Sequence, residues 1–327
     1  MVTYADIEMA YQRIAPLIIK TPLLTSDRLN DKLGFRLFVK AEPLQRIGAF
    51  KFRGACNAIL KLPDETKNII AFSSGNHAQA VALVSRITGH NATIIMPKDA
   101  PMAKIEATKS YGAEVILYDR YRESREDIGE RLSHERNAAL IKPYDDEDVI
   151  CGQGTIGIEL ADQIASQNIH PDRLYCCAGG GGLISGLSVA LHHTHTDLPI
   201  FAAEPQDYDD LKRSLETGNR VSNDTTRRSL CDAIVTPMPG EITFPILQTH
   251  LAGGVVATDD DCLRAMQTAW RYLKLVTEPG GAVAIAAALS LAGTDTSVKG
   301  KDIIAIASGG NVDDDIFARA LSIEGAI

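Results

Sequence analysis

Aromatic residues, cysteines and long apolar runs are all scarce in this chain of 327 residues. Aromatics make up 6% of it, and its six cysteines include no Cys-x-x-Cys pair, which argues against a disulfide scaffold and a zinc site. No run reaches the roughly 18 apolar residues of a membrane span, and the N-terminus lacks the basic and apolar segments of a secretory signal. Lys and Arg number 33 against 42 Asp and Glu, and this net charge of -9 excludes a surface for duplex nucleic acid. These absences predict a soluble cytoplasmic protein that binds neither nucleic acid nor a membrane.

Short runs rich in β-branched residues alternate with longer segments of helical period, in a chain long enough for one large domain or two ordinary ones. The strand-like runs are 37–40, 69–72, 92–96, 114–118, 174–178, 200–203, 255–257 and 303–307. The helix-like segments include 6–14, 78–86, 122–134, 156–164, 183–192, 259–273 and 282–292. This alternation predicts an α/β fold with parallel sheets covered by helices on both faces. Such a fold binds its ligand in loops at the carboxyl ends of the strands.

One of these loops follows the run 174–178 and contains four consecutive glycines, 179–182. Glycines let the backbone curl closely around an anion, and the N-terminus of the next helix adds free amides and a positive dipole end. We therefore expect this loop to bind a phosphate. Two alternatives are an ordinary glycine-rich turn and a dinucleotide site with Glu204 as its ribose-binding acid, although Gly-x-Gly-x-x-Gly fails in every register.

Two further loops with polar side chains also come directly after strand-like runs. Ser73-Ser74-Gly75-Asn76-His77 follows the run 69–72, and Ser308-Gly309-Gly310-Asn311 follows the run 303–307. Hydroxyls, a glycine and a carboxamide at a helix N-terminus suit a carboxylate or a phenolate. The alternative for both loops is a turn in which Ser or Asn only caps a helix.

Lys51 lies between Phe50 and Phe52, with Gly48 and Gly54 on either side. Aromatic neighbours can partly desolvate the amine, and this favours its neutral, nucleophilic form. A lysine taken alone is ordinarily a solvated surface residue. Beside three anion-binding loops, Lys51 is interpreted as the lysine that forms a Schiff base with a phosphorylated aldehyde cofactor.

Six motifs, in one order along the chain, carry a resemblance to a known family. They are the lysine segment 48–55, the loop 73–77, Gly152-Gln153-Gly154-Thr155, the glycine loop 179–182, Glu278-Pro279 and Ser308-Gly309-Gly310-Asn311. With them the whole chain resembles the fold-type II pyridoxal-phosphate (PLP) enzymes, and among these the threonine/serine dehydratases and the serine racemases. Ala49 stands where the family commonly has Ser, a departure also found in its racemase and hydroxyaspartate-dehydratase branches.

The resemblance implies a fold and a division into domains. The fold is tryptophan synthase β-like, with two open, twisted, mostly parallel sheets flanked by helices. A large PLP-binding domain would comprise residues 1–50 and 146–327. Residues 51–145 would form a small, inserted and mobile domain.

The same resemblance gives roles to the cofactor-binding residues. Lys51 would carry pyridoxal 5'-phosphate, with Phe50 against the ring. Asn76 would bind the phenolic oxygen of the cofactor and Ser308 its pyridine nitrogen, where a neutral hydroxyl favours elimination over transamination. The other cofactor-binding residues would be Gly179, Gly180, Gly181, Gly182, Leu183, Glu278 and Gly309, the first five through their amides to the phosphate.

The substrate-binding residues implied by the resemblance come mainly from the first polar loop. Ser74 and the amides of Asn76 and His77 would bind the substrate carboxylate at a helix N-terminus, with Ser73 beside them. Lys51 would remove the α-proton as general base. Ser74, on the opposite face of the substrate, would be a second base and would permit racemisation.

The implied reaction is β-elimination from a small β-hydroxy amino acid, L-threonine or L-serine, which gives a 2-oxo acid and ammonia. Alternatives are a serine racemase with side dehydratase activity and a 3-hydroxyaspartate dehydratase. Arg125 matches a family arginine that closes over the β-substituent and would favour a second carboxylate, although it could equally be a solvated helix charge. A non-catalytic, metabolite-binding relative is an alternative of another class, which the retention of Lys51 argues against.

A divalent metal ion is expected after the run 200–203. The carboxylates of Glu204 and Asp210 and the backbone carbonyl of Tyr208 are hard oxygen ligands suited to magnesium, calcium or manganese. The family match supports this set, whereas acids at this position otherwise serve only as helix caps. A rival cluster, His192, His193 and His195, has no carboxylates arranged around it.

The resemblance also implies binding partners, namely a nucleotide effector and another copy of the chain. A nucleotide effector would be contacted by residues that match the nucleotide-binding positions of eukaryotic racemases, namely Gln79, Tyr111, Lys274 and Asn311. Besides the amino acid substrate, the expected partner is another copy of the chain, in a homodimer or homotetramer.

Overall fold

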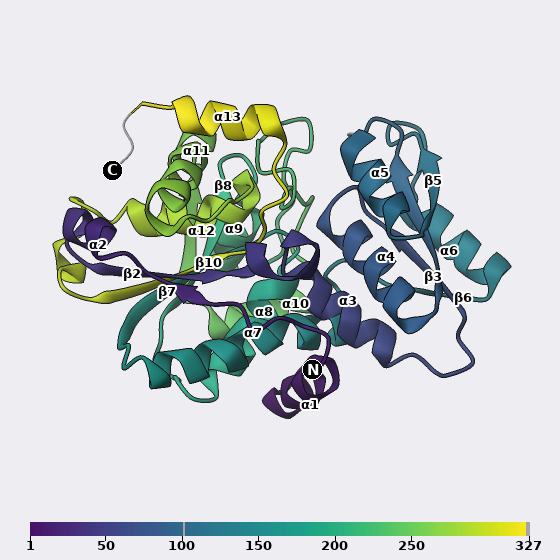
Figure 1. The fold of residues 1–327 in the computed structure, drawn as a ribbon, viewed down its shortest axis with the longest axis horizontal. Helices are drawn as coiled ribbons and strands as arrows, with labels where there is room; N and C mark the ends of the chain where they lie inside the picture. Colours follow the sequence, from purple (N-terminus) through teal and green to yellow (C-terminus); the bar gives the residue numbers. More distant parts are fainter. Residues whose placement is uncertain (101, 325–327) are drawn as a thin grey trace.

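The computed structural model describes residues 1–100 and 102–324, which form two separate sheets (Figure 1). The larger sheet has six strands in the order β1-β2-β10-β7-β8-β9, and the smaller has four in the order β5-β4-β3-β6. All pairings are parallel except that of β1 with β2. The bounds are β1 Leu23–Leu24, β2 Arg36–Ala41, β3 Asn68–Phe72, β4 Asn91–Pro97, β5 Glu114–Tyr118, β6 Ala138–Leu140, β7 Pro171–Cys177, β8 Ile200–Pro205, β9 Gly253–Ala257 and β10 Asp302–Ala307. The predicted α/β fold with mostly parallel sheets is confirmed.

The helices connect successive strands and cover the sheets (Figure 1). Their bounds are α1 Tyr4–Ile14, α2 Asp27–Leu33, α3 Lys51–Leu60, α4 Asn76–Thr88, α5 Met102–Ser110, α6 Arg125–Arg136, α7 Glu147–Ser166, α8 Gly182–His192, α9 Asp210–Thr217, α10 Thr243–His250, α11 Asp259–Thr268, α12 Pro279–Leu289 and α13 Asp314–Ser322. Short 3-10 turns occupy Glu42–Leu44, Arg46–Gly48 and Thr296–Val298, and a π-helical turn, Ala269–Leu273, extends α11.

All eight predicted strands are present, but β1 and β6 were not predicted. Both are short: β1 has two residues and β6 has three, and neither Leu23–Leu24 nor Ala138–Leu140 contains a β-branched residue. The sequence also placed the start of one helix at 122, whereas α6 begins at Arg125. The reason is local: the Ser124 side chain accepts a hydrogen bond from the Asp127 amide and caps the helix there.

The smaller sheet is buried on both faces because its strands alternate. In β3, Ile69 and Ala71 belong to the core formed with α3 and α4. Ile70 and Phe72 point to the other face, where Leu132 of α6 covers them. This alternation with a period of two residues is what sandwiches the sheet between helices.

The larger sheet carries α12 along β7 to β10, while α7 and α8 lie on its opposite side (Figure 1). Helices α7 and α8 approach closely because small residues face each other: a side chain on Gly154 would come within 2.9 Å of the Gly186 carbonyl oxygen. This close crossing brings α7 beside the loop that precedes α8. None of the helices in the described part of the chain combines the length and the apolar character needed to cross a membrane.

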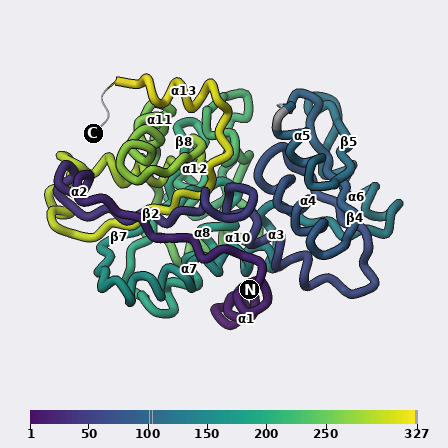
Figure 2. The backbone as a smooth tube through the Cα atoms, in the orientation of Figure 1, coloured from purple at the N-terminus to yellow at the C-terminus, as the bar shows by residue number. Residues whose placement is uncertain are grey.

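The chain path links the two sheets through α3 and α7, as the blue and teal parts of the tube show (Figure 2). Helix α3 packs against α4 of the smaller unit and against α7 of the larger. All four strands of the smaller sheet fall within 51–145, the range predicted for the small domain. The division at residues 50 and 146, and the mobility of the insert, stay predictions.

Candidate active site

A pocket of about 170 Å³ lies where strands of both sheets end. The ends of β3, β7 and β10 each contribute the loop that follows them, so three segments far apart in sequence converge. The predicted cofactor and substrate residues that line it are Phe50, Lys51, Ser73, Ser74, Asn76, His77, Arg125, Gly179, Gly180, Gly181, Gly182, Leu183, Glu278 and Ser308. Gly309 lies behind the wall, where a side chain would overlap Glu278 Oε1. The structure thus brings all these residues together around one pocket, while their individual roles stay predictions.

Lys51 is the first residue of α3 and points into this pocket. Its Nζ donates a hydrogen bond to the Pro143 carbonyl oxygen at 2.6 Å and lies 5.2 Å from the ring centre of Phe50. Burial lowers the pKa of Lys51 to about 8. The Phe50 amide donates to the Ser308 carbonyl oxygen at 3.0 Å, which ties the start of α3 to the loop after β10. The amine is therefore held in place and ready to act as a nucleophile near neutral pH.

The glycine loop forms the turn between β7 and α8. Gly181 has φ of 92°, in the left-handed region that favours glycine. A side chain on Gly180 would overlap the ring of Tyr144, and one on Gly182 would come within 3.0 Å of the Tyr144 backbone. Only glycines leave the backbone amides and the N-terminus of α8 open to the pocket, and this arrangement fits a phosphate group.

Asn76 links the loop after β3 with the other two loops. Its Nδ2 donates to Glu278 Oε1 at 2.6 Å, and its Oδ1 accepts from Asn311 Nδ2 at 2.7 Å. The carboxamide nitrogen carries two N–H groups, so one remains for a ligand. Burial raises the pKa of Glu278 to about 8, so this carboxyl group is largely protonated at neutral pH.

The loop after β3 opens α4, whose N-terminus faces the pocket. Ser73 Oγ accepts a hydrogen bond from the Gly75 amide at 3.2 Å. The His77 ring is buried and its Nε2 lies 3.0 Å from the Ile141 carbonyl oxygen, so Nε2 carries the proton and donates. Burial lowers the pKa of His77 to about 3, and the ring is neutral. Ser74 and the amides at this N-terminus are therefore the groups suited to a substrate carboxylate.

Two further cations, Arg125 and Lys104, line the pocket. Arg125 Nε pairs with Glu126 Oε1 at 2.8 Å, and its guanidinium lies 5.2 Å from the ring centre of Phe72. Lys104 of α5 was not predicted; its Nζ lies 2.8 Å from Oδ2 of Asp232, which also lines the pocket. No local pattern marked Lys104, because its pocket partner is 128 positions away.

Other pocket residues were also missed, among them Tyr144, Cys177 and the segment 232–237. Tyr144 covers the glycine loop, and Cys177 is the last residue of β7. The position of Cys177 at a strand end was a signal that could have identified it. Tyr144 had no such signal, since it lies in an irregular segment before α7.

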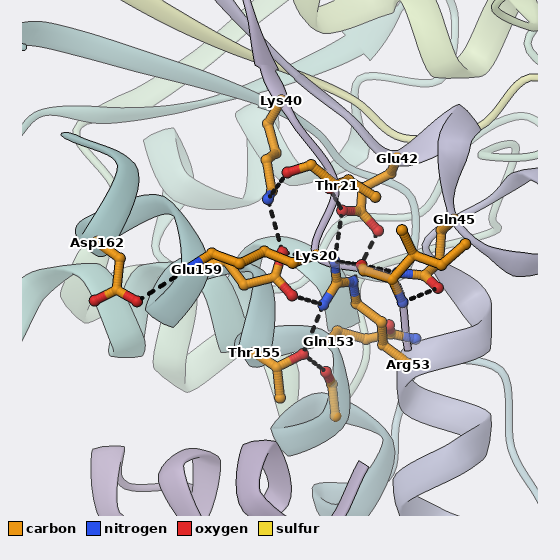
Figure 3. A network of polar contacts seen from close by, with 12 residues as sticks. Lys20, Thr21, Lys40, Glu42, Gln45, Arg53, Gln153, Thr155, Glu159 and Asp162 are labelled. Atoms are coloured by element: carbon orange, nitrogen blue, oxygen red, sulfur yellow. Dashed lines mark hydrogen bonds and ion pairs between the residues drawn. The ribbon is translucent and has the colours of Figure 1, made fainter. Parts of the chain in front are cut away.

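A network of buried charged groups surrounds Arg53 of α3 (Figure 3). Arg53 hydrogen-bonds Glu42 at 2.8 and 2.9 Å and Glu159 of α7 at 2.8 and 2.9 Å. Lys40 of β2 also pairs with Glu159, at 2.7 Å, and all four side chains are fully buried. These ion pairs connect the first turn of α3 to β2 and α7. Because the charges are buried, water cannot replace a partner that is lost.

The predicted metal ligands lie near the end of β8, which contains Glu204, and at the start of α9, which begins with Asp210. Both Glu204 carboxylate oxygens accept hydrogen bonds from backbone amides of α9, from Leu211 at 2.9 Å and from Lys212 at 2.8 Å. Asp210 is also buried, and its Oδ2 has no partner among the described residues. Burial, and then the neighbouring Asp210, raise the pKa of Glu204, and burial raises that of Asp210 to about 7. Two buried acids with an unsatisfied oxygen fit a divalent cation, which would relieve their repulsion.

Within residues 1–100 and 102–324, no three His, Cys, Asp or Glu side chains cluster as metal ligands. The expected set has only two such side chains, together with the Tyr208 carbonyl, so the absence of a larger cluster leaves that prediction untested. In the rival histidine segment, His192 Nδ1 lies 2.9 Å from His250 Nδ1, and the ring of His193 stacks on Tyr4 at 3.7 Å.

Comparison with known proteins identifies the family. Residues 14–309 match the family model described as pyridoxal-phosphate dependent enzyme. The chain is 42% identical to the L-threo-3-hydroxyaspartate ammonia-lyase of Saccharomyces cerevisiae over 98% of this chain and 96% of that protein. It is 38% identical to the serine racemase of Schizosaccharomyces pombe, over 98% and 97%.

Solved structures agree with this similarity. The T.th. threonine deaminase superposes with a TM-score of 0.89 at 39% identity, over 95% of this chain and 99% of that one. The structure of maize serine racemase gives a TM-score of 0.90 at 35% identity, over 98% and 97%. The glycine loop and the pocket lysine suit the same cofactor that these similarities indicate. The chain belongs to the fold-type II pyridoxal-phosphate dependent enzymes, in their group of ammonia-lyases and racemases.

Proposed function

We propose that the chain catalyses β-elimination of water from a small β-hydroxy amino acid, with release of ammonia and a 2-oxo acid. L-threonine and L-serine are the simplest substrates of this class. The observation that carries the proposal is the position of Lys51. Its amine, with a pKa of about 8, faces a pocket that has a glycine loop on one side and the N-terminus of α4 on another.

Pyridoxal phosphate, when bound, supplies the electron sink that acidifies the α-proton of an amino acid. Lys51 would hold the cofactor, and its amine would take the α-proton as general base. The N-terminus of α4 binds the substrate carboxylate through Ser74 and the amides of Asn76 and His77. Loss of the α-proton and the β-hydroxyl amounts to loss of water, and hydrolysis of the resulting imine gives the 2-oxo acid and ammonia.

A second substrate, 3-hydroxyaspartate, is favoured by the cations of the pocket. Besides Lys51, both Arg125 and Lys104 line the pocket, and either could pair with the second carboxylate of this substrate. In the structure Arg125 pairs with Glu126, and Lys104 pairs with Asp232. The similarity to two L-threo-3-hydroxyaspartate ammonia-lyases supports including this substrate.

Racemisation of serine is a second candidate reaction, and Ser74 is the residue that supports it. Ser74 lines the same pocket as Lys51 but comes from the loop after β3, so the two groups can reach a bound amino acid from different sides. A base on each face is what exchange of the α-proton with inversion requires. The serine racemases among the relatives agree with this proposal.

A panel of substrates tests these proposals together. Purified protein is incubated with L-threonine, L-serine and both 3-hydroxyaspartate diastereomers, and 2-oxo acid, ammonia and the chirality of the remaining amino acid are measured. We expect keto acid from at least one of them. An absence of both keto acid and inverted amino acid with every substrate, in a yellow protein, would contradict the reaction. A colourless protein would instead favour the non-catalytic alternative.

We also propose that a divalent cation, magnesium, calcium or manganese, binds between Glu204 and Asp210. The unpartnered, buried Asp210 Oδ2 supports this, because a buried carboxylate oxygen without a partner is rare. The backbone carbonyl of Tyr208 would complete the protein ligands. The cation would stabilise the turn between β8 and α9 and act on catalysis only indirectly.

The remaining expectations concern regulation and assembly, and they stay proposals. A nucleotide effector would contact Gln79, Tyr111, Lys274 and Asn311. Asn311 donates to the Ile47 carbonyl oxygen at 2.6 Å and to Asn76, so a ligand that bound it would act on the pocket directly. A homodimer or homotetramer and a cytoplasmic location are also predicted.

A further inference from the structure

The Gly152-Gln153-Gly154-Thr155 motif has no part in the roles described above, yet Gln153 lines the pocket. Gln153 lies in α7 and is 1% exposed. The helix crosses α8 beside it, where Gly154 meets Gly186, one turn beyond the glycine loop. Gln153 therefore lies between the start of α3, which carries Lys51, and the loop suited to a phosphate.

The orientation of the Gln153 carboxamide is fixed by α3. Its Oε1 accepts a hydrogen bond from the Gly54 amide at 3.1 Å, one turn after Lys51. The reverse orientation would set the amide nitrogen against this N–H donor, so Oε1 must face α3. Gly54 also has to be glycine, because a side chain there would overlap Gln153 Nε2.

The Nε2 group of Gln153 is buried and, within the described part of the chain, has no hydrogen-bond partner. A buried N–H group without an acceptor is unfavourable and rare. The Lys51 amine and the amides of the glycine loop, which line the same pocket, are themselves donors. The missing acceptor is therefore expected to arrive with the ligand.

We infer that Gln153 Nε2 donates a hydrogen bond to a phosphate oxygen of the bound cofactor. Gln153 is then a cofactor-binding residue with two functions. Its oxygen ties it to the helix of Lys51, and its nitrogen binds the phosphate, so the lysine and the phosphate are held in register by one side chain. The inference depends on the binding of pyridoxal phosphate and not on which reaction follows, so a failed substrate panel leaves it standing.

Two variants separate the functions of the carboxamide. Gln153→Glu keeps the oxygen that accepts from Gly54 but replaces the donor with an anionic oxygen. Gln153→Met has a similar length and removes both hydrogen bonds. Thr155→Val is the matched control, because Thr155 accepts from Arg53 Nη1 at 3.3 Å in the same motif but does not line the pocket.

The first readout is the ³¹P NMR signal of the phosphate in each holoprotein. The second is the affinity of each cofactor-free protein for pyridoxal phosphate and for pyridoxal, which lacks the phosphate. Loss of one hydrogen bond to an anion weakens binding by about 10- to 100-fold. We expect that loss for pyridoxal phosphate with Gln153→Met, and a larger one with Gln153→Glu because like charges then meet. We also expect a shifted ³¹P signal and an affinity for pyridoxal within about three-fold of wild type, since the phosphate bond is absent there.

The control should keep the wild-type ³¹P signal and the wild-type ratio of the two affinities, even if its melting temperature falls. Equal losses for pyridoxal phosphate and pyridoxal would overturn the inference, because Gln153 would then act only through Lys51. An unchanged ³¹P signal and unchanged affinity for pyridoxal phosphate would overturn it as well.

Discussion

Removing Arg53 from the buried charge network should destabilise the protein strongly (Figure 3). Arg53→Leu removes the guanidinium that pairs with Glu42 and Glu159, and all three side chains are fully buried. Glu159 keeps its ion pair with Lys40, whereas the Glu42 carboxylate keeps, among the described residues, a hydrogen bond from the Thr21 hydroxyl at 2.6 Å and the field of the Lys40 charge without a direct pair. Breaking a buried ion pair from one side costs about 3–5 kcal/mol, because the remaining charge is left uncompensated.

This free energy can be measured as a shift in melting temperature. At about 2.1 cal/mol/K per residue, unfolding of a chain of this length carries an entropy of about 0.7 kcal/mol/K, so the melting temperature should fall by about 4–7 °C. Arg131→Leu is the control, since Arg131 pairs with Glu135 at the surface with 59% of its side chain exposed. The loss there should stay under about 0.5 kcal/mol.

The pH dependence distinguishes an orphaned charge from simple loss of packing. Burial alone would raise the pKa of Glu42, but Arg53 outweighs it and holds the pKa below its usual value. The stability that Glu42 contributes to the wild type is thus present above its unfolded pKa and is lost as the pH falls. Without Arg53 the pKa of Glu42 should rise, and the variant should lose stability as the pH rises. The gap between wild type and Arg53→Leu should therefore be wider at pH 8 than at pH 5.

A second substitution should recover part of the loss. Glu42→Gln, added to Arg53→Leu, removes the charge that was left unpaired, so the double variant should melt above Arg53→Leu alone. A shift of less than about 2 °C for Arg53→Leu, equal at both pH values, would refute the reasoning, because 1 kcal/mol already corresponds to about 1.5 °C.

Three further predictions concern the site. The rate at which cofactor-free protein takes up pyridoxal phosphate should rise with pH and level off above about 8, the pKa of Lys51, because only the neutral amine attacks the aldehyde; a rise continuing to pH 10 would contradict that pKa. Ser74→Ala should reduce racemisation more than elimination, and an equal loss of both, measured on one sample, would leave Ser74 only a substrate-binding role. Magnesium at 100 times its dissociation constant should add about 2.7 kcal/mol of stability. At one fixed magnesium concentration the gain should be greater at pH 8 than at pH 6, because the pKa of Asp210 is about 7 and its protonation weakens binding. Glu204→Gln should abolish the gain, and melting curves with and without chelator are the check.

The central strands of the sheets could be predicted because they are apolar and buried on both faces. β4 and β10, for example, are almost wholly buried, and their runs of Ile and Ala are visible in the sequence. Helix α3 was not predicted as a helix, since it is buried on nearly every side and includes buried Arg53 and Asn57, so no polar face marks it. Its environment depends on α7, which lies about a hundred positions away in the sequence.

Many of the residues that line the pocket were predicted, but the contacts between distant segments were not. Loops at strand ends and their glycines are local features, so the residues around Lys51 and the glycine loop were found. Lys104 and Asp232, which meet at 2.8 Å, were not, because only the fold brings them together. The same holds for the partner of Lys51, the carbonyl of Pro143, 92 positions further along.

The central claim is that Lys51 carries the cofactor, and reductive labelling tests it most directly. The purified, yellow protein is reduced with borohydride and digested, and the peptide that bears the pyridoxyl group is identified by mass spectrometry. The label should be found on Lys51, and Lys51→Ala should fold, remain unlabelled and lose elimination. A label on Lys104, the other lysine that lines the pocket, or equal labelling of the Lys51→Ala variant would contradict the claim.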